Sequence, residues 1–283
     1  MSYADQKFVD LCLEVLENGT TTEGQKVRPV WPDTGKLAYT IKTFGVATTY
    51  DLQKEFPALT LRKTALKSCM DEILWIYQRK SNNIHDLAPH VWDEWADETG
   101  GIGKAYGWQV GHQMIDVKGT WMDQMDFVLH TLKTEPFSRR IKISLWNPTE
   151  LHQMRLQPCC YDLTFNVTDE RKEKLVLNLH LVQRSQDILA ANNWNVCQYA
   201  ILLMMVAQVS DMIPGKLFHT ITDAHIYDRH VPIIQELITR DQFPAPKVHL
   251  NPEITNFYDF TTEHLIVEDY VAGEQIKDIP IAV

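Results

Sequence analysis

The apolar residues of this chain follow two different periods, and the change between them is the sequence feature that most limits its fold. Over 141–145, 161–167 and 175–183, apolar and polar residues alternate, as in strands that bury one face. The stretch 196–212 is instead strongly apolar, which predicts a buried helix. Strands and helices that mix without regular βαβ alternation favour a single α+β domain.

The first half of the chain is mainly helical in pattern. Three segments carry apolar side chains at helical spacing and predict helices: 5–17, 64–79 and 121–134. The first of these runs ends at Asn18-Gly19. Residues 20–50 are rich in turn-forming residues, so we expect a loop that leads into short strands. No internal repeat or linker interrupts the chain, and we expect 1–283 to form one domain.

Composition narrows the classes of function. Of the 283 residues, 45% are hydrophobic, which suffices for one large core. No run of about eighteen apolar residues predicts a membrane span, and no basic region followed by an apolar run predicts a signal peptide. We therefore expect a cytoplasmic protein. The net charge of −10 argues against DNA or RNA as a non-specific partner, although clustered arginines can still bind a small anion.

A proline followed by two cysteines is the first candidate site. Cys159 and Cys160 follow Pro158 between two of the predicted strands. A free thiol has a pKa of about 8.5, so a nucleophilic cysteine needs a positive neighbour to form the thiolate. Arg184 lies at the end of the next predicted strand, and pairing of the two strands would bring it to Cys159. The alternative is that Cys159 is a small buried apolar residue, as we expect of the other four cysteines, which show neither CxxC spacing nor a disulfide framework.

Two adjacent arginines form the second candidate site. Arg139 and Arg140 directly precede a predicted strand. Guanidinium groups bind oxyanions through two parallel hydrogen bonds, so the pair suits a phosphate or a carboxylate. The alternative interpretation is a solvated basic patch.

Histidine and tyrosine side chains form the third candidate site. His225 and Tyr227 share one face of an extended segment and could together hold a sugar hydroxyl. A metal site made of His219, His225 and His230 was also considered. Their spacing matches no usual zinc pattern and includes no thiolate, so we expect no metal.

These clusters occur in an order that resembles the thymidylate synthase family over nearly the whole chain. The resemblance is to the short form of the family, and most of all to its branch in bacilli and their phages. The matching motifs are Glu72-Ile73-Leu74-Trp75, Val91-Trp92-Asp93-Glu94-Trp95, Ala105-Tyr106-Gly107, Ser138-Arg139-Arg140, Trp146-Asn147-Pro148, Leu156-Gln157-Pro158-Cys159, Gln183-Arg184-Ser185-Gln186-Asp187, Asn195, Asp223-Ala224-His225-Ile226-Tyr227 and Ile281-Ala282-Val283.

The resemblance implies a fold, a reaction and a partner. The fold would be one catalytic domain over 1–283, with a mixed β-sheet packed by helices, and two copies would dimerise through the sheet. The reaction would be reductive methylation of dUMP to dTMP. Its co-substrate would be 5,10-methylenetetrahydrofolate, which leaves as dihydrofolate, and no metal would take part. Each copy would donate Arg139 and Arg140 to the neighbouring site, and neither a membrane nor DNA is an expected partner.

The resemblance also implies a catalytic role for five residues. Cys159 would attack C6 of the uracil ring, which makes C5 a carbon nucleophile, and Arg184 would favour its thiolate. Glu72 would order waters for proton transfer, and Tyr106 would assist removal of the C5 proton. Asn195 would read O4 and N3 of the pyrimidine, because an amide is both donor and acceptor.

Further residues are implied in binding rather than in chemistry. The residues expected to bind dUMP are Arg28, Arg184, Ser185, Asp187, Asn195, His225 and Tyr227, with Arg139 and Arg140 from the partner copy. Among these, the arginines and Ser185 would hold the phosphate, and His225 with Tyr227 the 3′-hydroxyl. The residues expected to bind folate are Trp92, Asp187 and Val283.

The sequence also departs from the family pattern at several positions. Cys160 replaces a histidine, Thr164 a glutamine and Thr222 a glycine, and the N-terminal Arg-Thr-Gly turn becomes Arg28-Pro29-Val30-Trp31. The usual Leu-Gly-x-Pro-Phe-Asn is rewritten as Ala190-Ala191-Asn192-Asn193-Trp194-Asn195.

These changes leave the covalent first half of the mechanism intact and open an alternative for the second half. That alternative is a nucleotide 5-hydroxymethylase, in which water traps the methylene. Asn195 favours dUMP over dCMP as its substrate, since a relative that acts on cytosine has aspartate there. A catalytically silent nucleotide-binding or RNA-binding protein is a third possibility. The presence of every expected polar residue argues against it.

Overall fold

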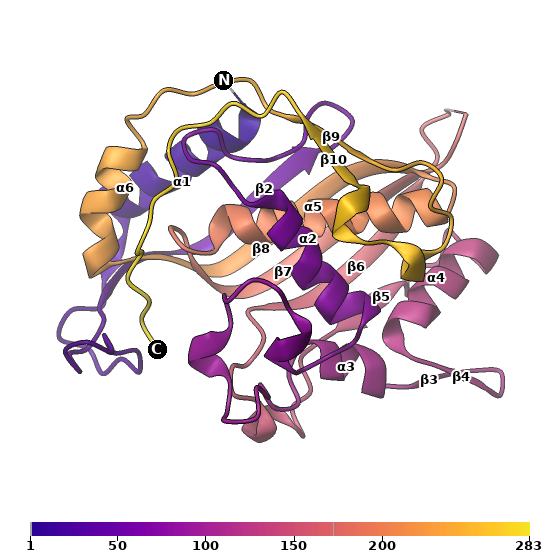
Figure 1. Ribbon diagram of the computed structural model, residues 1–283, viewed down its shortest axis with the longest axis horizontal. Helices are drawn as coiled ribbons and strands as arrows, with labels where there is room; N and C mark the ends of the chain where they lie inside the picture. Colours follow the sequence, from indigo (N-terminus) through magenta and orange to yellow (C-terminus); the bar gives the residue numbers. More distant parts are fainter. Residues whose placement is uncertain (1, 172) are drawn as a thin grey trace.

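A six-stranded sheet forms the centre of the computed structural model, which describes residues 2–171 and 173–283. The strands lie in the order β1-β2-β8-β7-β6-β5 (Figure 1). Strands β7 and β8 run parallel to each other, and every other neighbouring pair in this sheet is antiparallel. The bounds of the strands are β1 Thr20–Thr21, β2 Thr40–Asp51, β5 Lys142–Ser144, β6 Cys160–Thr168, β7 Val176–Asp187 and β8 Ile213–Tyr227.

The three strands predicted from alternation are confirmed as β5, β6 and β7. Leu177, Leu179 and Leu181 are buried in β7, whereas the residues between them are partly exposed, because only one face of the sheet is covered by helix. The expectation of a loop and short strands over 20–50 is wrong in part. The twelve-residue β2 pairs along its length with β8. Gly45, read as a turn signal, lies inside β2 with a φ of 79°.

The predicted helices are also confirmed, with shifted ends. They are α1 Tyr3–Asn18, α2 Leu66–Ile73, which continues as a π-helix over Leu74–Gln78, α4 Gln124–Thr134 and α5 Asn192–Val209. Helix α4 begins later than expected because Asp123 caps it, accepting hydrogen bonds from the amides of Met125 and Asp126 at 3.0 Å each. Helix α5 begins four residues before the expected start, and its first turn therefore carries Trp194 and Asn195.

The remaining elements surround this core. They are α3 Gly107–His112, the hairpin of β3 Ile115–Val117 and β4 Thr120–Met122, α6 Val231–Leu237, the two-stranded sheet of β9 Lys247–Leu250 and β10 Leu265–Glu268, and 3₁₀ turns at Ile84–Asp86, Asp93–Trp95, Leu151–Gln153, Asp228–His230, Phe257–Asp259 and Thr262–His264. None of the helices within the described residues combines the length and apolarity needed to span a bilayer.

The two faces of the sheet differ in cover. Helices α2 and α5 lie in front of the sheet in Figure 1, and α5 is packed against β7 and β8. On the opposite face, Phe218 of β8 is 39% exposed, and Phe44, beside Gly45 in β2, is 85% exposed. His180 and Phe218 pack together there, with ring centroids 4.8 Å apart. The molecule thus has the expected α+β fold with a mixed sheet, and one face of that sheet remains open.

Candidate active site

Pairing of β6 with β7 brings Cys159 and Arg184 together, as the sequence predicts. Cys159 directly precedes β6, and the backbone N–H of Arg184 donates to its carbonyl at 3.0 Å. The Nη2 atom of Arg184 lies 3.7 Å from Sγ of Cys159. The guanidinium is fixed there by hydrogen bonds to the carbonyls of Pro158, at 3.0 Å, and Gln157, at 2.7 Å.

The environment of Cys159 acts on its thiol in two opposite ways. Burial raises the pKa of the Cys159 thiol, whereas the charges of Arg184 and Arg28 lower it, and the net direction is upward. The other four cysteines are fully buried, as expected. The neighbouring Cys160 has no exposed thiol to offer a ligand, and burial raises its pKa well above the usual range. Cys159 is therefore the partly exposed thiol with cations beside it.

Tyr106 contacts the same segment. Its hydroxyl oxygen accepts a hydrogen bond from the backbone N–H of Cys159 at 3.1 Å. Tyr106 has a φ of 45° at the N-terminus of α3, a conformation that costs a bulky residue free energy and is typical of functional sites. A side chain on the next residue, Gly107, would place its Cβ 2.1 Å from the carbonyl oxygen of Ser81. This close approach requires glycine at position 107, and it packs the backbone next to Tyr106 against Ser81.

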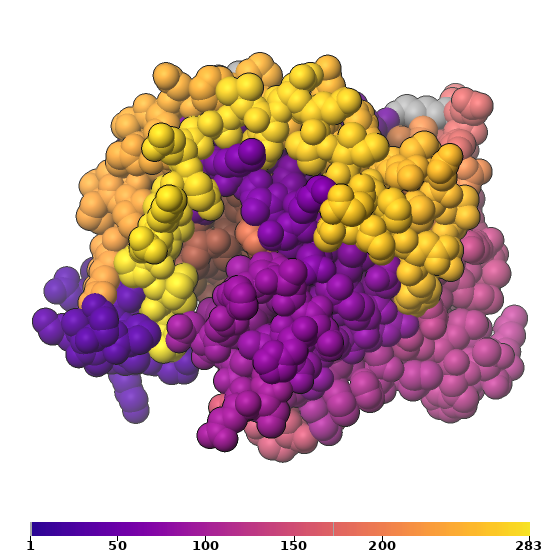
Figure 2. All heavy atoms as spheres, in the orientation of Figure 1, coloured from indigo at the N-terminus to yellow at the C-terminus, as the bar shows by residue number. Residues whose placement is uncertain are grey.

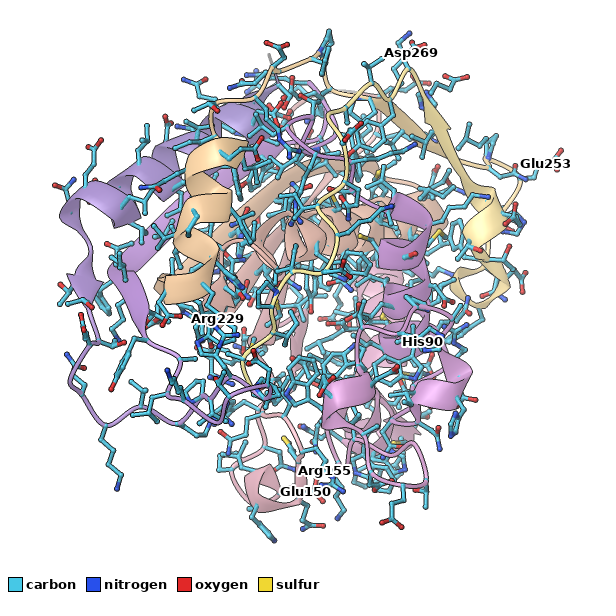
Figure 3. The ribbon with its side chains drawn as sticks, turned by 60° about the vertical axis from the view of Figure 1, so that its left-hand side comes forward. His90, Glu150, Arg155, Arg229, Glu253 and Asp269 are labelled. Carbon is cyan, nitrogen blue, oxygen red and sulfur yellow. The ribbon has the colours of Figure 1, made fainter. Side chains whose placement is uncertain are left out.

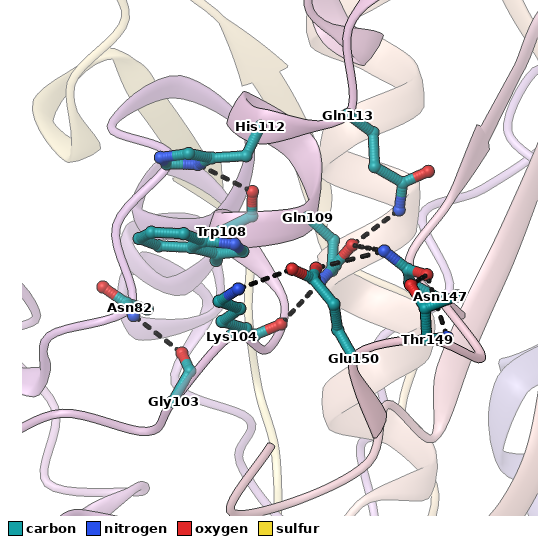
Figure 4. Close-up of polar contacts among 10 residues, drawn as sticks. All are labelled: Asn82, Gly103, Lys104, Trp108, Gln109, His112, Gln113, Asn147, Thr149 and Glu150. Carbon is teal, nitrogen blue, oxygen red and sulfur yellow. Dashed lines mark hydrogen bonds and ion pairs between the residues drawn. The ribbon is translucent and has the colours of Figure 1, made fainter. Parts of the chain in front are cut away.

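A polar network supports the segment that carries Tyr106 (Figure 4). The buried Gln109 donates from Nε2 to the carbonyl of Lys104 at 2.7 Å and to Oε2 of Glu150 at 2.8 Å. Lys104 closes the network through an ion pair with Glu150 at 2.7 Å. No motif in the sequence marks these three residues, because their contacts depend on the folded position of α3.

Two tryptophans hold the buried carboxylate of Glu72. Nε1 of Trp92 donates to Oε1 at 3.0 Å, and Nε1 of Trp194 donates to Oε2 at 2.8 Å. Burial raises the pKa of Glu72, and the hydrogen bonds from Trp194 and Trp92 oppose that rise. The Trp92 ring also packs on Tyr106, with centroids 4.9 Å apart. In the sequence, Trp194 stands out only as a departure from the family pattern, without an expected function.

An amide network orients Asn195. Its Oδ1 accepts from Nε2 of Gln183 at 3.1 Å, and its Nδ2 donates to Oε1 of Gln198 at 3.0 Å. Gln183 in turn accepts from Nε2 of His219 at 2.8 Å. Burial lowers the pKa of His219 to about 3, so this ring is neutral near pH 7. His219, first considered as a metal ligand, therefore serves as a hydrogen-bond partner of Gln183.

His225 and Tyr227 lie side by side on β8, as predicted, with ring centroids 5.1 Å apart. Nδ1 of His225 contacts Oδ1 of Asp223 at 2.9 Å, which fixes the ring orientation. Asp223 also forms an ion pair with Lys42 of β2 at 2.6 Å. The pair of rings is thus held by contacts from two neighbouring strands.

Asp187 ends β7 and faces His230. Nδ1 of His230 lies 3.4 Å from Oδ1 of Asp187, and its Nε2 donates to the carbonyl of Pro280 at 2.7 Å. Pro280 belongs to the C-terminal segment, residues 270–283, which ends at Val283. Figure 2 shows a hollow between this yellow segment and the purple chain that follows β2.

The end of the C-terminal segment pairs with the loop that follows Arg28. Val30 and Val283 exchange two backbone hydrogen bonds, at 2.9 Å and 3.1 Å. The loop is itself anchored by Trp31, whose Nε1 donates to Asp228 at 3.1 Å, and by Arg229, which projects from the turn before α6 (Figure 3) and lies over the Trp31 ring. Chain segments far apart in the sequence thus close one side of the site.

Comparison with known proteins then decides the family. The model of the family described as thymidylate synthase matches residues 6–283. The chain is 38% identical over 279 residues to a thymidylate synthase of Bacillus licheniformis, 37% to thymidylate synthase 1 of Bacillus subtilis strain 168 and 36% to the thymidylate synthase of Bacillus phage phi3T, with 98% of each chain covered. The solved thermostable thymidylate synthase A from Bacillus subtilis superimposes with a TM-score of 0.92 at 36% identity, over all of both chains.

The chain belongs to the thymidylate synthase family. This confirms the resemblance to the branch found in bacilli and their phages, the fold class and the interpretation of the chain as a methyltransferase of this family. Family membership does not by itself assign the roles of individual residues.

The departures from the family pattern have structural explanations in part. Asn193 is buried, and its Oδ1 accepts from the amide of Leu59 at 3.0 Å and from Oγ1 of Thr64 at 2.8 Å, while its Nδ2 donates to the carbonyl of Pro57 at 2.8 Å. It therefore ties the start of α5 to the segment before α2. Thr164 lies in β6 opposite His180 and borders the open face of the sheet.

Arg139 and Arg140 stand apart from the other predicted residues. Both are exposed in the turn between α4 and β5. Within the described part of this chain, the cations that act on the Cys159 thiol are Arg184 and Arg28. A single copy therefore brings together the predicted residues on β6, β7, β8 and α5 but leaves this arginine pair on its surface.

Proposed function

We propose that the protein catalyses the reductive methylation of dUMP to dTMP with 5,10-methylenetetrahydrofolate, and that residues 1–283 form one catalytic domain. The observation that supports this best is the contact of 3.7 Å between Nη2 of Arg184 and Sγ of Cys159 in a chain of this family. A thiol that is partly exposed and flanked by a guanidinium suits nucleophilic addition.

The first half of the proposed reaction uses the thiolate. Arg184, Arg28 and Ser185 bind the 5′-phosphate, and His225 with Tyr227 holds the 3′-hydroxyl. The Cys159 thiolate then adds to C6, forming the S–C6 bond and moving the electron pair of the C5=C6 bond toward C5 and O4. Asn195 stabilises the charge that develops on O4 by hydrogen bonding.

The second half depends on proton transfer and on exclusion of water. Glu72 orders water beside the pyrimidine, and Tyr106 assists removal of the C5 proton. Re-formation of the C5=C6 bond expels the Cys159 thiolate and frees the product. When bound, the folate supplies the one-carbon unit and the hydride that reduces it.

The residues near the hollow fit a folate. Although burial alone would raise the pKa of the Asp187 carboxyl, the neighbouring histidines His230 and His225 hold it below its usual range, so Asp187 is an ionised acceptor for the N–H groups of a pterin. Trp92 supplies an aromatic wall, and Val283 ends the C-terminal segment that closes the site. This closure favours hydride over water as the final reactant.

We further propose that two copies form a homodimer through the open face of the sheet. Exposed phenylalanines such as Phe44 and Phe218 are typical of an interface. Strand alternation puts Arg184 on the same face as His180 and Val182, so a copy that covers this face can bring its Arg139 and Arg140 to the same phosphate.

One assay tests the proposed reaction. Purified protein is given dUMP and methylenetetrahydrofolate, the nucleotides are separated by chromatography, and dihydrofolate is followed by its absorbance, with Cys159→Ser as the inactive control. We expect dTMP and dihydrofolate in equal amounts. Hydroxymethyl-dUMP without dihydrofolate would replace this proposal with the hydroxymethylase, and a protein that forms neither product is not the enzyme proposed.

A further inference from the structure

The carboxylate of Glu72 is held at both of its oxygens by indole N–H groups from two different parts of the chain. Trp92 directly precedes the 3₁₀ turn Asp93–Trp95, and Trp194 lies in the first turn of α5. Glu72 is 5% exposed, and the Trp92 bond is buried while the Trp194 bond is partly buried. Hydrogen bonds to a charged acceptor are strong in such surroundings.

The Trp194 hydrogen bond is a property of this sequence. The family pattern has phenylalanine at this position, and phenylalanine has no hydrogen-bond donor. Because Trp194 directly precedes Asn195, the same helical turn presents a donor to Glu72 and the amide expected to read the base. The side-chain oxygen of Gln198, one turn further along α5, accepts a hydrogen bond from Asn195. The start of α5 therefore carries both the indole that contacts Glu72 and the amide network that orients Asn195.

Among the groups around Glu72, the two indoles lower the pKa of its carboxyl against the effect of burial. Burial keeps the neighbouring thiols and phenols neutral, since it raises the pKa of each one: Cys69 on the same helix α2, Tyr77 of the π-helix, Tyr106 before α3 and Cys160 of β6. The charged neighbour is Asp71, which raises the pKa of Glu72 further. Neutral hydrogen-bond donors therefore oppose the rise that burial causes in the pKa of Glu72.

We propose that Trp194 is a positioning residue that, with Trp92, fixes both oxygens of Glu72 and keeps this carboxylate in the one orientation that orders water for proton transfer. The inference rests on the proposed function, in which Glu72 orders water for proton transfer beside the pyrimidine. Trp194 acts through Glu72 and needs no contact with the substrate.

The test is Trp194→Phe, compared with Trp95→Phe as a matched control. Trp95 packs on the Trp92 ring with centroids 5.9 Å apart, and the structure gives it no side-chain hydrogen bond to Glu72. Loss of the Trp194 donor removes an influence that lowers the pKa of Glu72, so more of the carboxyl is protonated at a given pH. We expect the acid limb of the kcat–pH profile to move to higher pH and kcat to fall by about tenfold, as for a misplaced group in proton transfer. Trp95→Phe should move neither.

A double-mutant cycle with Glu72→Gln shows whether Trp194 acts through the carboxylate. In the Glu72→Gln background the change Trp194→Phe should have little further effect on kcat or on the pH profile, because the titrating group is gone. An equal effect of Trp194→Phe in both backgrounds would overturn the inference, as would a Trp194→Phe profile that coincides with the wild type.

A measurement on the protein without any change at Trp194 covers the case in which that variant does not fold. The chain has eight tryptophans, and ¹⁵N labelling gives each indole N–H its own signal. Two of these signals should titrate together with Glu72, and Glu72→Gln should abolish their titration. A single titrating signal would refute the proposal that both indoles hold the Glu72 carboxylate. This result is independent of turnover, so a wild-type protein that forms no dTMP would contradict the proposed function without deciding the indole contacts.

Discussion

The contacts of His230 with Asp187 and Pro280 help to hold the C-terminal segment closed. His230 is fully buried, and its Nε2 must carry a proton to donate to the Pro280 carbonyl at 2.7 Å. Nδ1 then faces Oδ1 of Asp187 at 3.4 Å, and its protonation makes this contact an ion pair. The change His230→Phe removes both interactions while keeping an aromatic ring in the position next to Trp31.

The size of the effect follows from these two contacts. A hydrogen bond between neutral groups contributes about 1 kcal/mol net. Loss of the histidine beside Asp187 adds about 1 kcal/mol, less than for a fully buried pair, because the Asp187 side chain keeps 18% of its exposure. A total of about 2 kcal/mol corresponds to a fall of roughly 30-fold in the ratio of closed to open C-terminal segment.

The same contacts predict how closure depends on pH. Although burial lowers the pKa of His230, the Asp187 carboxylate and the Pro280 carbonyl raise it above its usual range. A group with a raised pKa stabilises the closed form fully below its ordinary value of about 6.5, and that contribution is lost as pH rises through the higher pKa. The lowered pKa of Asp187 has the opposite sign, and its contribution is lost only as pH falls below about 4. Closure should therefore be strongest between about pH 4 and 6.5 and weaken above that range.

Hydrogen–deuterium exchange of residues 276–283, corrected for the intrinsic rate at each pH, measures this closure. His230→Phe should exchange about 30-fold faster than the wild type at pH 6, as expected from the 2 kcal/mol above. His230→Gln is the matched control, because its amide keeps a donor for Pro280 but has no titrating proton. It should be intermediate in protection and lose the pH dependence. Equal protection in His230→Phe and the wild type, or an unchanged pH dependence in His230→Gln, would refute this reasoning.

Three further predictions concern the proposed reaction and the proposed dimer. Fluoro-dUMP with folate should form a covalent adduct with the wild type and with Cys160→Ala but not with Cys159→Ser, and peptide mapping of an adduct to Cys160 would contradict the assignment. Mixing Arg139→Ala with Cys159→Ser protein should restore activity in heterodimers, because one of the two sites then has both residues. The absence of complementation, once subunit exchange is demonstrated, would exclude shared phosphate sites. Asn195→Asp should lose dUMP turnover and gain relative activity on dCMP, because an unmatched buried polar group costs roughly 1–3 kcal/mol, whereas unchanged discrimination would show that another residue reads the base.

Periodicity alone was sufficient for much of the fold. The alternation over 175–183 predicted the central strand β7, and the apolar run over 196–212 predicted α5, because one-sided burial imposes a period that local sequence must obey. Periodicity did not predict the long strand β2. It lies at the side of the sheet with one face open, so its threonines and exposed Phe44 give no clean alternation, and Gly45 reads as a turn until its partner β8 is known.

Some features of the site could likewise be predicted from the sequence, and others depend on the fold. The sequence by itself determined which groups could do chemistry, and it predicted that Arg184 would meet Cys159, because pairing of neighbouring strands follows from their order. Only the tertiary structure decided that Trp194 would donate to Glu72, 122 positions away in the chain, and that the C-terminal segment would pair with the loop after Arg28. The physical reason is that the direction of a side chain is set by what packs around it. Contacts between segments that are distant in sequence produce no periodic pattern in the local sequence, so they cannot be predicted from it.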